Sequence, residues 1–212
     1  MKLKGFIFDL DGTLVNTLPV CYTAFQKVFQ KYLGRHYNDV EIASLFGPSE
    51  EGIFQKLLPH CWQDALNDYL AEYEKAGRGI LPFPGITAAL QLLKDKQFPL
   101  AIVSGKGPGS MKISLQVSGL GDYFDPVITG SEQSARKPDH LRQVLALWKI
   151  EPQEVAYIGD TPYDIVAAKE VGILSLGALW APTVEVEKVK NTKPFKAFKD
   201  VAVLIQWIKK EF

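Results

Sequence analysis

The fold of this chain is decided by its residues 5–14, which read Gly-Phe-Ile-Phe-Asp-Leu-Asp-Gly-Thr-Leu. The apolar run at the start has no alternation with polar residues, which is typical of a strand buried on both faces of a parallel sheet. Two carboxylates, Asp9 and Asp11, follow it directly. Open α/β sheets bind their ligands beyond the carboxyl ends of the strands, so we expect these carboxylates in a ligand site.

The rest of the chain alternates strand and helix patterns from residue 85 onward. Apolar runs at residues 98–103, 124–128, 154–158 and 173–176 predict further strands. Apolar residues at helical spacing predict helices over 86–93, 111–118, 141–148 and 165–169, the last ending before Gly172. This alternation predicts an α/β domain with a Rossmann-like, doubly wound parallel sheet.

Residues 16–80 break the alternation. Apolar stripes predict one helix over 20–32 that ends at Gly34, one that Ser49 caps, and one over 66–73 that ends at Gly77. Residues 81–85, Leu-Pro-Phe-Pro-Gly, predict a stiff return, since proline fixes φ and disfavours helix before it. We therefore predict an α/β core domain of residues 1–15 and 81–212, with an inserted all-helical cap domain of residues 16–80.

The composition excludes several kinds of partner. The 212 residues carry 24 Lys and Arg against 24 Asp and Glu, so no excess of positive charge predicts binding to nucleic acid or an acidic membrane. No stretch approaches the roughly 20 apolar residues that span a bilayer. The start of the chain does not read as a secretory leader, and Cys21 and Cys61 are expected as free thiols. We expect a cytoplasmic protein, a monomer or homodimer.

Polar residues that suit phosphate chemistry follow several of the predicted strands. Asp9 and Asp11 could share a divalent cation such as Mg²⁺, although two aspartates beside a glycine also form ordinary turns. Ser104 and Gly105 could hold an anion or form a plain turn. Lys137 precedes a proline at a helix start, where it could point to the same edge of the sheet or into solvent.

The segment Gly159-Asp160-Thr161-Pro162-Tyr163-Asp164 follows the strand predicted at 154–158. It supplies two more carboxylates where a strand gives way to a helix. Asp160 and Asp164 could hold a metal, or they could serve only as helix-start residues. The joint order of these motifs along the chain is more specific than any one of them, and the motif at residues 9–14 is the most specific part.

Asp-x-Asp-Gly-Thr-Leu, then Ser104, then Lys137, then Gly-Asp-x-x-x-Asp resembles the haloacid dehalogenase-like hydrolase superfamily. The resemblance covers essentially the whole chain, with the helical insertion in the place of the family's cap. It implies that Asp9 is a nucleophile that forms an aspartyl phosphate and that Asp11 is a general acid and base.

The resemblance also implies the remaining site. Mg²⁺ would be bound by the Asp9 carboxylate, the Asp11 carbonyl and Asp160, with Asp164 supporting the metal site. Three further residues would hold the phosphoryl group, namely Ser104, Gly105 and Lys137. The substrate would be a small phosphate ester. An acid at Asp11 favours an oxygen leaving group over a halide, because a halide needs no proton.

Three positions depart from the family pattern. Asn16 stands where many relatives carry Asp, at the border of the expected cap. His140 replaces a second proline and is expected on a helix surface. Gly105-Lys106 replaces Asn-Lys, and Lys106 could approach the substrate or lie solvated in a loop. The sequence leaves both readings of Lys106 open.

Residues 46–51, Phe-Gly-Pro-Ser-Glu-Glu, lie between two predicted cap helices, where relatives meet their substrate. An ordinary interhelix turn is the other reading. The pattern resembles phosphoglycolate phosphatases most, and pyrophosphatases or sugar- and nucleotide-phosphate phosphatases remain alternatives. A mutase is less expected, because Phe46-Gly47 and Glu51 stand where the mutases have Lys-Gly and Arg. A non-catalytic phosphate-binding domain is the alternative from another class.

Overall fold

The computed structural model describes residues 2–212 and contains a six-stranded parallel sheet. The strand order is β3-β2-β1-β4-β5-β6. The strands are β1 (Gly5–Phe8), β2 (Leu100–Val103), β3 (Val127–Ile128), β4 (Val155–Gly159), β5 (Leu174–Ala178) and β6 (Lys196–Phe198). The first strand therefore lies inside the sheet, with Phe8 level with Ile102 on one side and Ile158 on the other. This topology confirms the predicted Rossmann-like fold.

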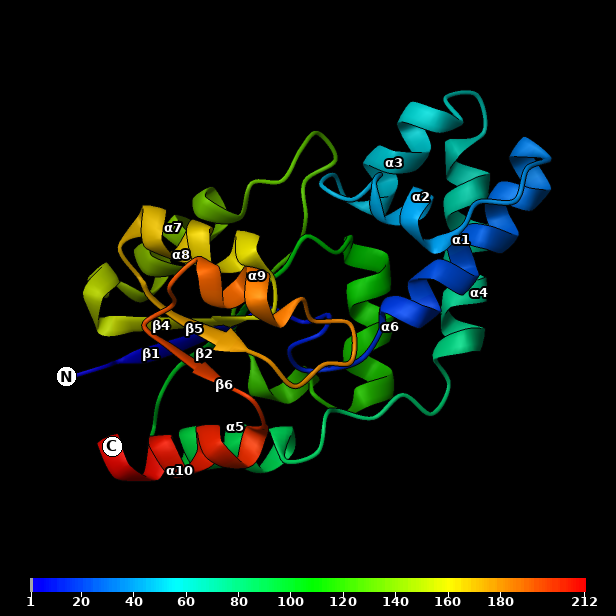
Figure 1. Ribbon diagram of the computed structural model, residues 1–212. Helices are drawn as coiled ribbons and strands as arrows, with labels where there is room; N and C mark the ends of the chain where they lie inside the picture. Colours follow the sequence, from blue (N-terminus) through cyan, green and yellow to red (C-terminus); the bar gives the residue numbers. More distant parts are fainter. Residues whose placement is uncertain (1) are drawn as a thin grey trace.

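Helices cover both faces of the sheet (Figure 1). Phe6 and Phe8 of β1 pack on the face covered by α5 (Ile86–Asp95), α6 (Pro108–Ser118) and α10 (Val201–Glu211). Ile7 packs on the opposite face, against α7 (Lys137–Trp148) and α8 (Pro162–Val171). Because neighbouring side chains point to opposite faces, a strand between two helical layers is apolar at every position. This explains why β1 shows no alternation.

The predicted strands and helices of this domain are largely confirmed, with differences at the edges of the sheet. The strand expected over 124–128 is only Val127–Ile128. The sequence analysis did not identify β6, α9 (Val186–Asn191) or α10. The strand β6 has three residues and begins with an exposed Lys196, so its pattern is too short and polar to stand out. The described residues also form two 3₁₀ turns, η1 (Gly121–Tyr123) and η2 (Pro152–Glu154).

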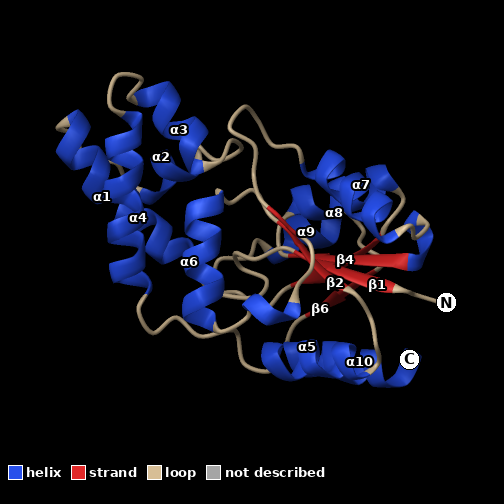
Figure 2. Cartoon of the chain, turned by 180° about the vertical axis from the view of Figure 1, so that it is seen from behind, coloured by secondary structure: helices blue, strands red, loops and turns tan. Residues whose placement is uncertain are grey.

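Four helices form the insertion after β1: α1 (Leu18–Leu33), α2 (Asp39–Ala43), α3 (Glu50–Leu57) and α4 (Trp62–Gly77). Figure 2 shows them to one side of the sheet. They enclose a hydrophobic cluster of their own, in which the rings of Phe25 and Tyr69 lie 4.5 Å apart between centroids. This separate cluster supports the division into an α/β core domain of residues 1–15 and 81–212 and a cap domain of residues 16–80. The division itself stays a prediction.

The ends of these helices only partly follow the expectations. Gly34 ends α1 in the left-handed conformation, as its position predicts. Gly77 is the last residue of α4, which is capped by Arg78. Ser49 is the N-cap of α3, but its side chain makes no capping hydrogen bond, and its buried hydroxyl has no hydrogen-bond partner among residues 2–212. Its backbone N–H donates to Ser131 O at 2.8 Å instead.

The insertion lies closed on the α/β domain. Gln55 Nε2 donates to Glu132 Oε2 at 3.0 Å, and Tyr73 Oη lies 2.8 Å from Ser114 Oγ. Gly52 permits the closest approach, because a Cβ there would lie 1.9 Å from the carbonyl oxygen of Glu132. Through these contacts the insertion covers the carboxyl ends of the central strands.

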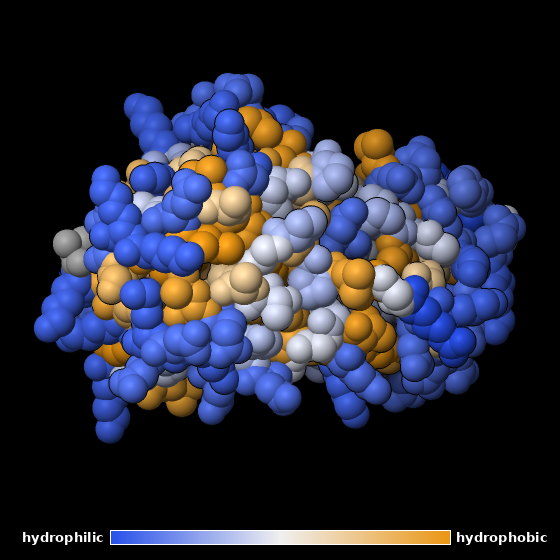
Figure 3. All heavy atoms as spheres, turned by 90° about the horizontal axis from the view of Figure 1, so that it is seen from below, coloured by the Kyte–Doolittle hydropathy of each residue, from blue (hydrophilic) through white to orange (hydrophobic). Residues whose placement is uncertain are grey.

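The outer surface is mostly hydrophilic on the side of α5 and α10, where apolar residues form groups bordered by polar ones (Figure 3). Among residues 2–212, no helix has both the length and the apolar character needed to cross a bilayer.

Candidate active site

The sheet topology brings three of the predicted site residues to one edge. β1 lies between β2 and β4, so Asp9, Ser104 and Asp160 each follow a neighbouring strand. The backbone continues the ladder one residue further, since Asp9 N donates to Ile158 O at 2.9 Å. The side chains of these three residues are almost fully buried. The three polar side chains therefore lie at the same end of neighbouring strands, where the sequence places them.

Lys137 connects two of the carboxylates. It is the first residue of α7, and its Nζ lies 3.0 Å from Asp9 Oδ1. It also forms an ion pair and hydrogen bond with Asp164 Oδ1, to which Tyr157 Oη donates at 3.0 Å. Lys137 is 9% exposed, so the alternative of a solvated surface lysine is wrong.

The electrostatics of this group are set by burial. Loss of water raises the pKa of Asp9 to about 7, against the opposing effect of Lys137. Burial also raises the pKa of Asp160 well above its usual range, with the nearby Asp164 adding to the shift. For Asp164, burial acts in the same direction, but Lys137 and the hydrogen bonds from Thr161 outweigh it and lower the pKa.

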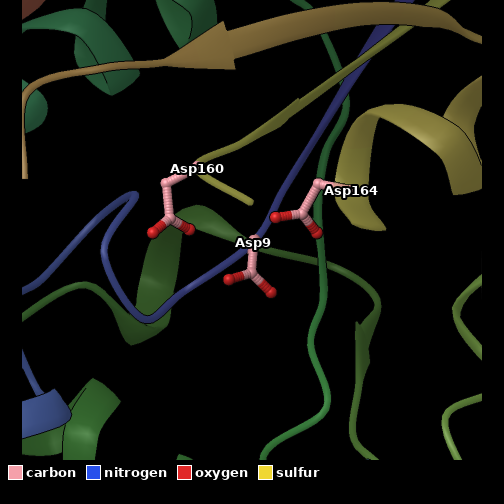
Figure 4. Close-up of side chains that lie close together, drawn as sticks. All are labelled: Asp9, Asp160 and Asp164. Atoms are coloured by element: carbon pink, nitrogen blue, oxygen red, sulfur yellow. The ribbon is translucent and has the colours of Figure 1, made fainter. Parts of the chain in front are cut away.

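The three carboxylates fit a hard divalent cation. Asp9, Asp160 and Asp164 each offer an oxygen within 4.8 Å of the others, and Asp160 and Asp164 lie on either side of Asp9 in Figure 4. Burial raises the pKa of Asp9 and of Asp160 even with Lys137 nearby, because the loss of water has the larger effect. Carboxylate oxygens are the ligands that Mg²⁺ prefers. The donor set therefore suits Mg²⁺.

Gly12 makes the close approach of Asp160 possible. Its φ is +74°, and a Cβ at this position would lie 2.1 Å from Asp160 Oδ2. Thr13 Oγ1, the next side chain, lies 3.3 Å from Asp160 Oδ1 as a hydrogen-bond donor. The glycine of the Asp-x-Asp-Gly motif thus serves both the turn and the packing against the carboxylate.

The Asp11 side chain points away from the acidic cluster. Its Oδ1 accepts a hydrogen bond from Thr17 Oγ1 and lies 3.1 Å from Lys106 Nζ. The Lys106 side chain is 1% exposed, and its Nζ also lies 3.4 Å from Cys21 Sγ and 4.7 Å from the centre of the Tyr73 ring. Of the two readings of Lys106, the solvated loop lysine is wrong.

Glu50 belongs to the segment 46–51, which the sequence left open as a substrate-facing segment or an ordinary interhelix turn. It is buried, and its carboxylate accepts hydrogen bonds from Gly107 N, Ser110 Oγ and Tyr69 Oη. Its Oε1 lies 4.0 Å from Lys106 Nζ. Glu50 thus ties α3 to the start of α6. The position of Glu50 directly after the turn at 46–49 was the sequence signal that could have pointed to it. The sequence pattern does not show which residues of the α/β domain Glu50 contacts.

A cavity of about 440 Å³ connects Asp9 and Asp160 with the Asp11–Lys106 pair and with Glu50. Its walls include Asp9, Asp11, Ser104, Gly105, Lys137 and Asp160 from the α/β domain, and Phe46 and Glu50 from the insertion. No atom lies within 4 Å of the place where a Cβ on Gly105 would project, so the backbone there is open to the cavity. The arrangement can accept an anion beside Lys137 and a cation beside Asp160.

The remaining predicted positions lie around this cavity. Asn16 is partly buried, and its Oδ1 has no hydrogen-bond partner among the described residues. His140 borders a neighbouring hollow of about 20 Å³, and burial lowers its pKa. Thr161 is the N-cap of α8 and Asp164 completes its capping box, so Asp164 does serve as a helix-start residue, whereas the alternative of Asp160 as the cap is wrong.

Comparison with known proteins gives a consistent result. A family model described as haloacid dehalogenase-like hydrolase matches residues 6–178. The pyrophosphatase PpaX of Listeria monocytogenes serotype 4b is 32% identical over 185 residues, which cover 85% of each chain. A haloacid dehalogenase-like hydrolase from Streptococcus pneumoniae, SP0104, superposes with a TM-score of 0.77 at 26% identity, covering 97% of this chain and 98% of the other.

A solved structure described as a predicted phosphoglycolate phosphatase from Haemophilus somnus 129PT also has a TM-score of 0.77. It is 20% identical and covers 98% of this chain and 99% of the other. At this identity the likeness concerns the fold alone.

Proposed function

Since the chain belongs to the haloacid dehalogenase-like hydrolase family and is a phosphatase-type enzyme, we propose that it hydrolyses a small phosphate monoester through an aspartyl phosphate on Asp9. One observation carries this proposal. The Asp9 carboxylate lies in the cavity, 3.0 Å from Lys137 Nζ and within the reach of the same cation as Asp160. Such a site can bring a dianionic phosphate next to a carboxylate nucleophile without prohibitive repulsion.

In the first step, an Asp9 oxygen attacks phosphorus, and the bond from phosphorus to the leaving oxygen breaks. Asp11 donates a proton to that oxygen, which leaves as an alcohol. Ser104, Gly105 and Lys137 hold the phosphoryl oxygens in line for the attack.

In the second step, water attacks the phosphorus of the aspartyl phosphate while Asp11 takes a proton from the water. Inorganic phosphate leaves and the Asp9 carboxylate is restored, so atoms and charges balance over the cycle.

Mg²⁺ would be bound by Asp9, Asp160 and the Asp11 carbonyl, and it would neutralise charge on the transferring phosphoryl group. Asp164 would support this site by fixing Lys137 and the turn at Thr161. The hydrogen bond from Thr17 and the ion pair with Lys106 would orient Asp11 toward the leaving group. The cytoplasmic location, and the choice between monomer and homodimer, stay predictions.

Pyrophosphate is the second candidate substrate, and the name of the relative at 32% identity favours it. Phosphoglycolate is favoured by the resemblance of the sequence motifs to those of phosphoglycolate phosphatases. Sugar and nucleotide monophosphates fit the same chemistry. A binding domain without catalysis is a weaker proposal, because it gives no role to the carboxylates and lysines gathered around Asp9.

The direct test is hydrolysis of p-nitrophenyl phosphate by the wild type and by Asp9→Asn, each with Mg²⁺ and with a chelator. We expect turnover only in the wild type with Mg²⁺, and a loss of at least about 10³-fold in the variant. Asp122→Asn, at an exposed position, is the matched control and should retain full activity. Turnover by Asp9→Asn at the wild-type rate would refute the aspartyl-phosphate route.

A further inference from the structure

The cavity carries information about the part of the substrate that leaves. Accepting the proposed function, we infer that the substrate's leaving group is an uncharged alcohol bearing an aromatic ring, and not a second phosphate or a carboxylate. The leaving group of an attack by Asp9 must lie beyond Asp11, on the side of the cavity that the insertion lines.

The wall supplied by the insertion is apolar. Five of its side chains are hydrophobic or weakly polar, namely Leu18, Cys21, Phe25, Phe46 and Ile53. Gly47 and Pro48 continue the wall without a charge. Apolar walls stabilise a bound group by removing its apolar surface from water, and they offer nothing to replace the hydration of an anion.

The charges on this side oppose an anion. Within residues 2–212, Glu50 is the one charged residue that the insertion contributes to the cavity lining, and no Lys, Arg or His joins it from α1–α4. An anionic leaving group would therefore lose water and meet a carboxylate of the same sign.

The lysines that line the cavity already face carboxylates. Lys106 lies 3.1 Å from Asp11 Oδ1 and 4.0 Å from Glu50 Oε1. Lys137 is held by Asp9 and Asp164 on the phosphoryl side. A second phosphate would bring negative charge that neither lysine ammonium group is free to balance. An uncharged alcohol leaves the ion pairs of Lys106 and of Lys137 intact.

Arg136 does not change this balance. It borders the neighbouring hollow of about 20 Å³ and not the main cavity, and its guanidinium pairs with Asp139 at 3.0 Å. That hollow has little space for a phosphate or carboxylate that extends from the cavity.

Two phenyl rings line the apolar wall at an angle of 45° to each other, and Phe46 is the more exposed of the two. Phe25 and Phe46 lie 6.3 Å apart between ring centres, and both line the cavity. Phe46 is 41% exposed although it stacks on Tyr22 at 6.0 Å, so apolar ring surface remains for a ligand to cover. Aromatic rings prefer offset or edge-to-face contacts with other rings, which favours an aromatic leaving group over an aliphatic one of equal area.

The test compares kcat/KM for matched phosphate esters with Mg²⁺. Benzyl phosphate and 4-carboxybenzyl phosphate differ in charge, as do ethyl phosphate and 2-phosphoglycolate, and pyrophosphate is added. We expect kcat/KM for each ester with an uncharged leaving group to exceed that of its carboxylated partner by about tenfold or more, and kcat/KM for benzyl phosphate to exceed that for ethyl phosphate by about tenfold or more.

The outcomes separate this inference from the proposed function. Preference for pyrophosphate or 2-phosphoglycolate, with activity that still requires Asp9, would overturn the inference and leave the phosphatase standing. No hydrolysis of any ester by the wild type would overturn both. Binding of benzyl phosphate and 2-phosphoglycolate to Asp9→Asn, measured by calorimetry, should show the same order of affinity without any turnover.

Two variants locate the effect. Phe46→Ala should reduce the ratio of benzyl to ethyl phosphate turnover at least about fivefold, because the ring contact is lost. Phe195→Ala is the matched control, since Phe195 is 56% exposed and lies outside the cavity lining, and it should leave the ratio unchanged. An unchanged ratio in Phe46→Ala would contradict the stacking surface.

Discussion

Lys106 Nζ lies 3.1 Å from Asp11 Oδ1, in a place where the lysine side chain is 1% exposed. The lysine belongs to the α/β domain, yet its other neighbours, Cys21, Glu50 and Tyr73, belong to the helical insertion. Burial acts to lower the pKa of Lys106, but Asp11 and the other groups around it raise the pKa well above its usual range. The ion pair therefore links the proposed acid to the closed position of the insertion.

Removing this charge should reduce both stability and proton transfer. Lys106→Met leaves Asp11 and Glu50 without their cation, and breaking a buried pair costs about 3 kcal/mol. We expect urea unfolding to show a loss of this size. We also expect kcat to fall more for benzyl phosphate than for p-nitrophenyl phosphate, whose leaving group needs little protonation.

Lys31→Met is the control for Lys106→Met. Lys31 pairs with Asp68 on the surface, and its side chain is 62% exposed. Exposed pairs contribute at most about 1 kcal/mol, so the control should remain near wild-type stability. Equal effects of the two substitutions would show that the buried pair has no special role.

Alanine substitutions at Gly12 and Gly34 should distinguish the cost of backbone strain from the cost of a clash with the acidic cluster. Both have positive φ, +74° and +64°, but a Cβ on Gly34 would meet no atom within 4 Å. Gly34→Ala should therefore cost about 1 kcal/mol from the backbone alone. Gly12→Ala adds a clash with Asp160 and should cost more, which thermal unfolding can measure.

Gly12→Ala should also weaken Mg²⁺ binding, because Asp160 has to move. The readout is the rise in Tm on adding Mg²⁺, which follows the affinity for the folded state. The rise should shrink in Gly12→Ala and persist in Gly34→Ala. Equal shifts in the two variants would contradict the assignment of Asp160 to the cation.

Glu50 should control the closure of the insertion. Its carboxylate accepts the hydrogen bond of Gly107 N at the start of α6. In Glu50→Ala this N–H loses its partner, so hydrogen exchange over residues 105–111 should accelerate at least about tenfold. Glu74→Ala, on the exposed face of α4, is the control and should leave the exchange unchanged. Unchanged exchange in Glu50→Ala would show that other contacts hold the insertion closed.

The two thiols should react at very different rates. Burial raises the pKa of Cys21 to about 11, so at pH 8 roughly one Cys21 in a thousand is a thiolate. Cys61 is partly exposed at the start of α4. Peptide mass spectrometry after brief iodoacetamide treatment should find Cys61 labelled at least about tenfold faster. Faster labelling of Cys21 would show that the insertion opens readily in solution.

The part of the site that belongs to the sheet could be predicted from the sequence. Buried parallel strands show unbroken apolar runs, and their carboxyl ends meet at one edge, so Asp9, Ser104 and Asp160 could be brought together without coordinates. Lys137 could likewise be expected at this edge of the sheet, but its ion pair with Asp164 could not be predicted. Periodicity alone does not fix which carboxylate a helix-start lysine meets.

The part of the site that belongs to the insertion could not be predicted in this way. The burial of Lys106 and Glu50 depends on how α1–α4 lie on the α/β domain, and apolar stripes contain no information on that placement. Ser49 shows the same limit, because its N-cap position was predictable while its bond to Ser131 was not. Sequence patterns describe each element, and the contacts between elements decide these residues.

The interior position of β1 has a consequence for how the protein is made. Its neighbours β2 and β4 begin at residues 100 and 155, after the whole insertion has left the ribosome. A nascent chain shorter than about 160 residues must hold an apolar first strand with an unpaired edge, and such long-range pairing is slow to form. The growing polypeptide is therefore exposed to aggregation, and dependent on chaperones, until β4 has been synthesised and can pair with β1.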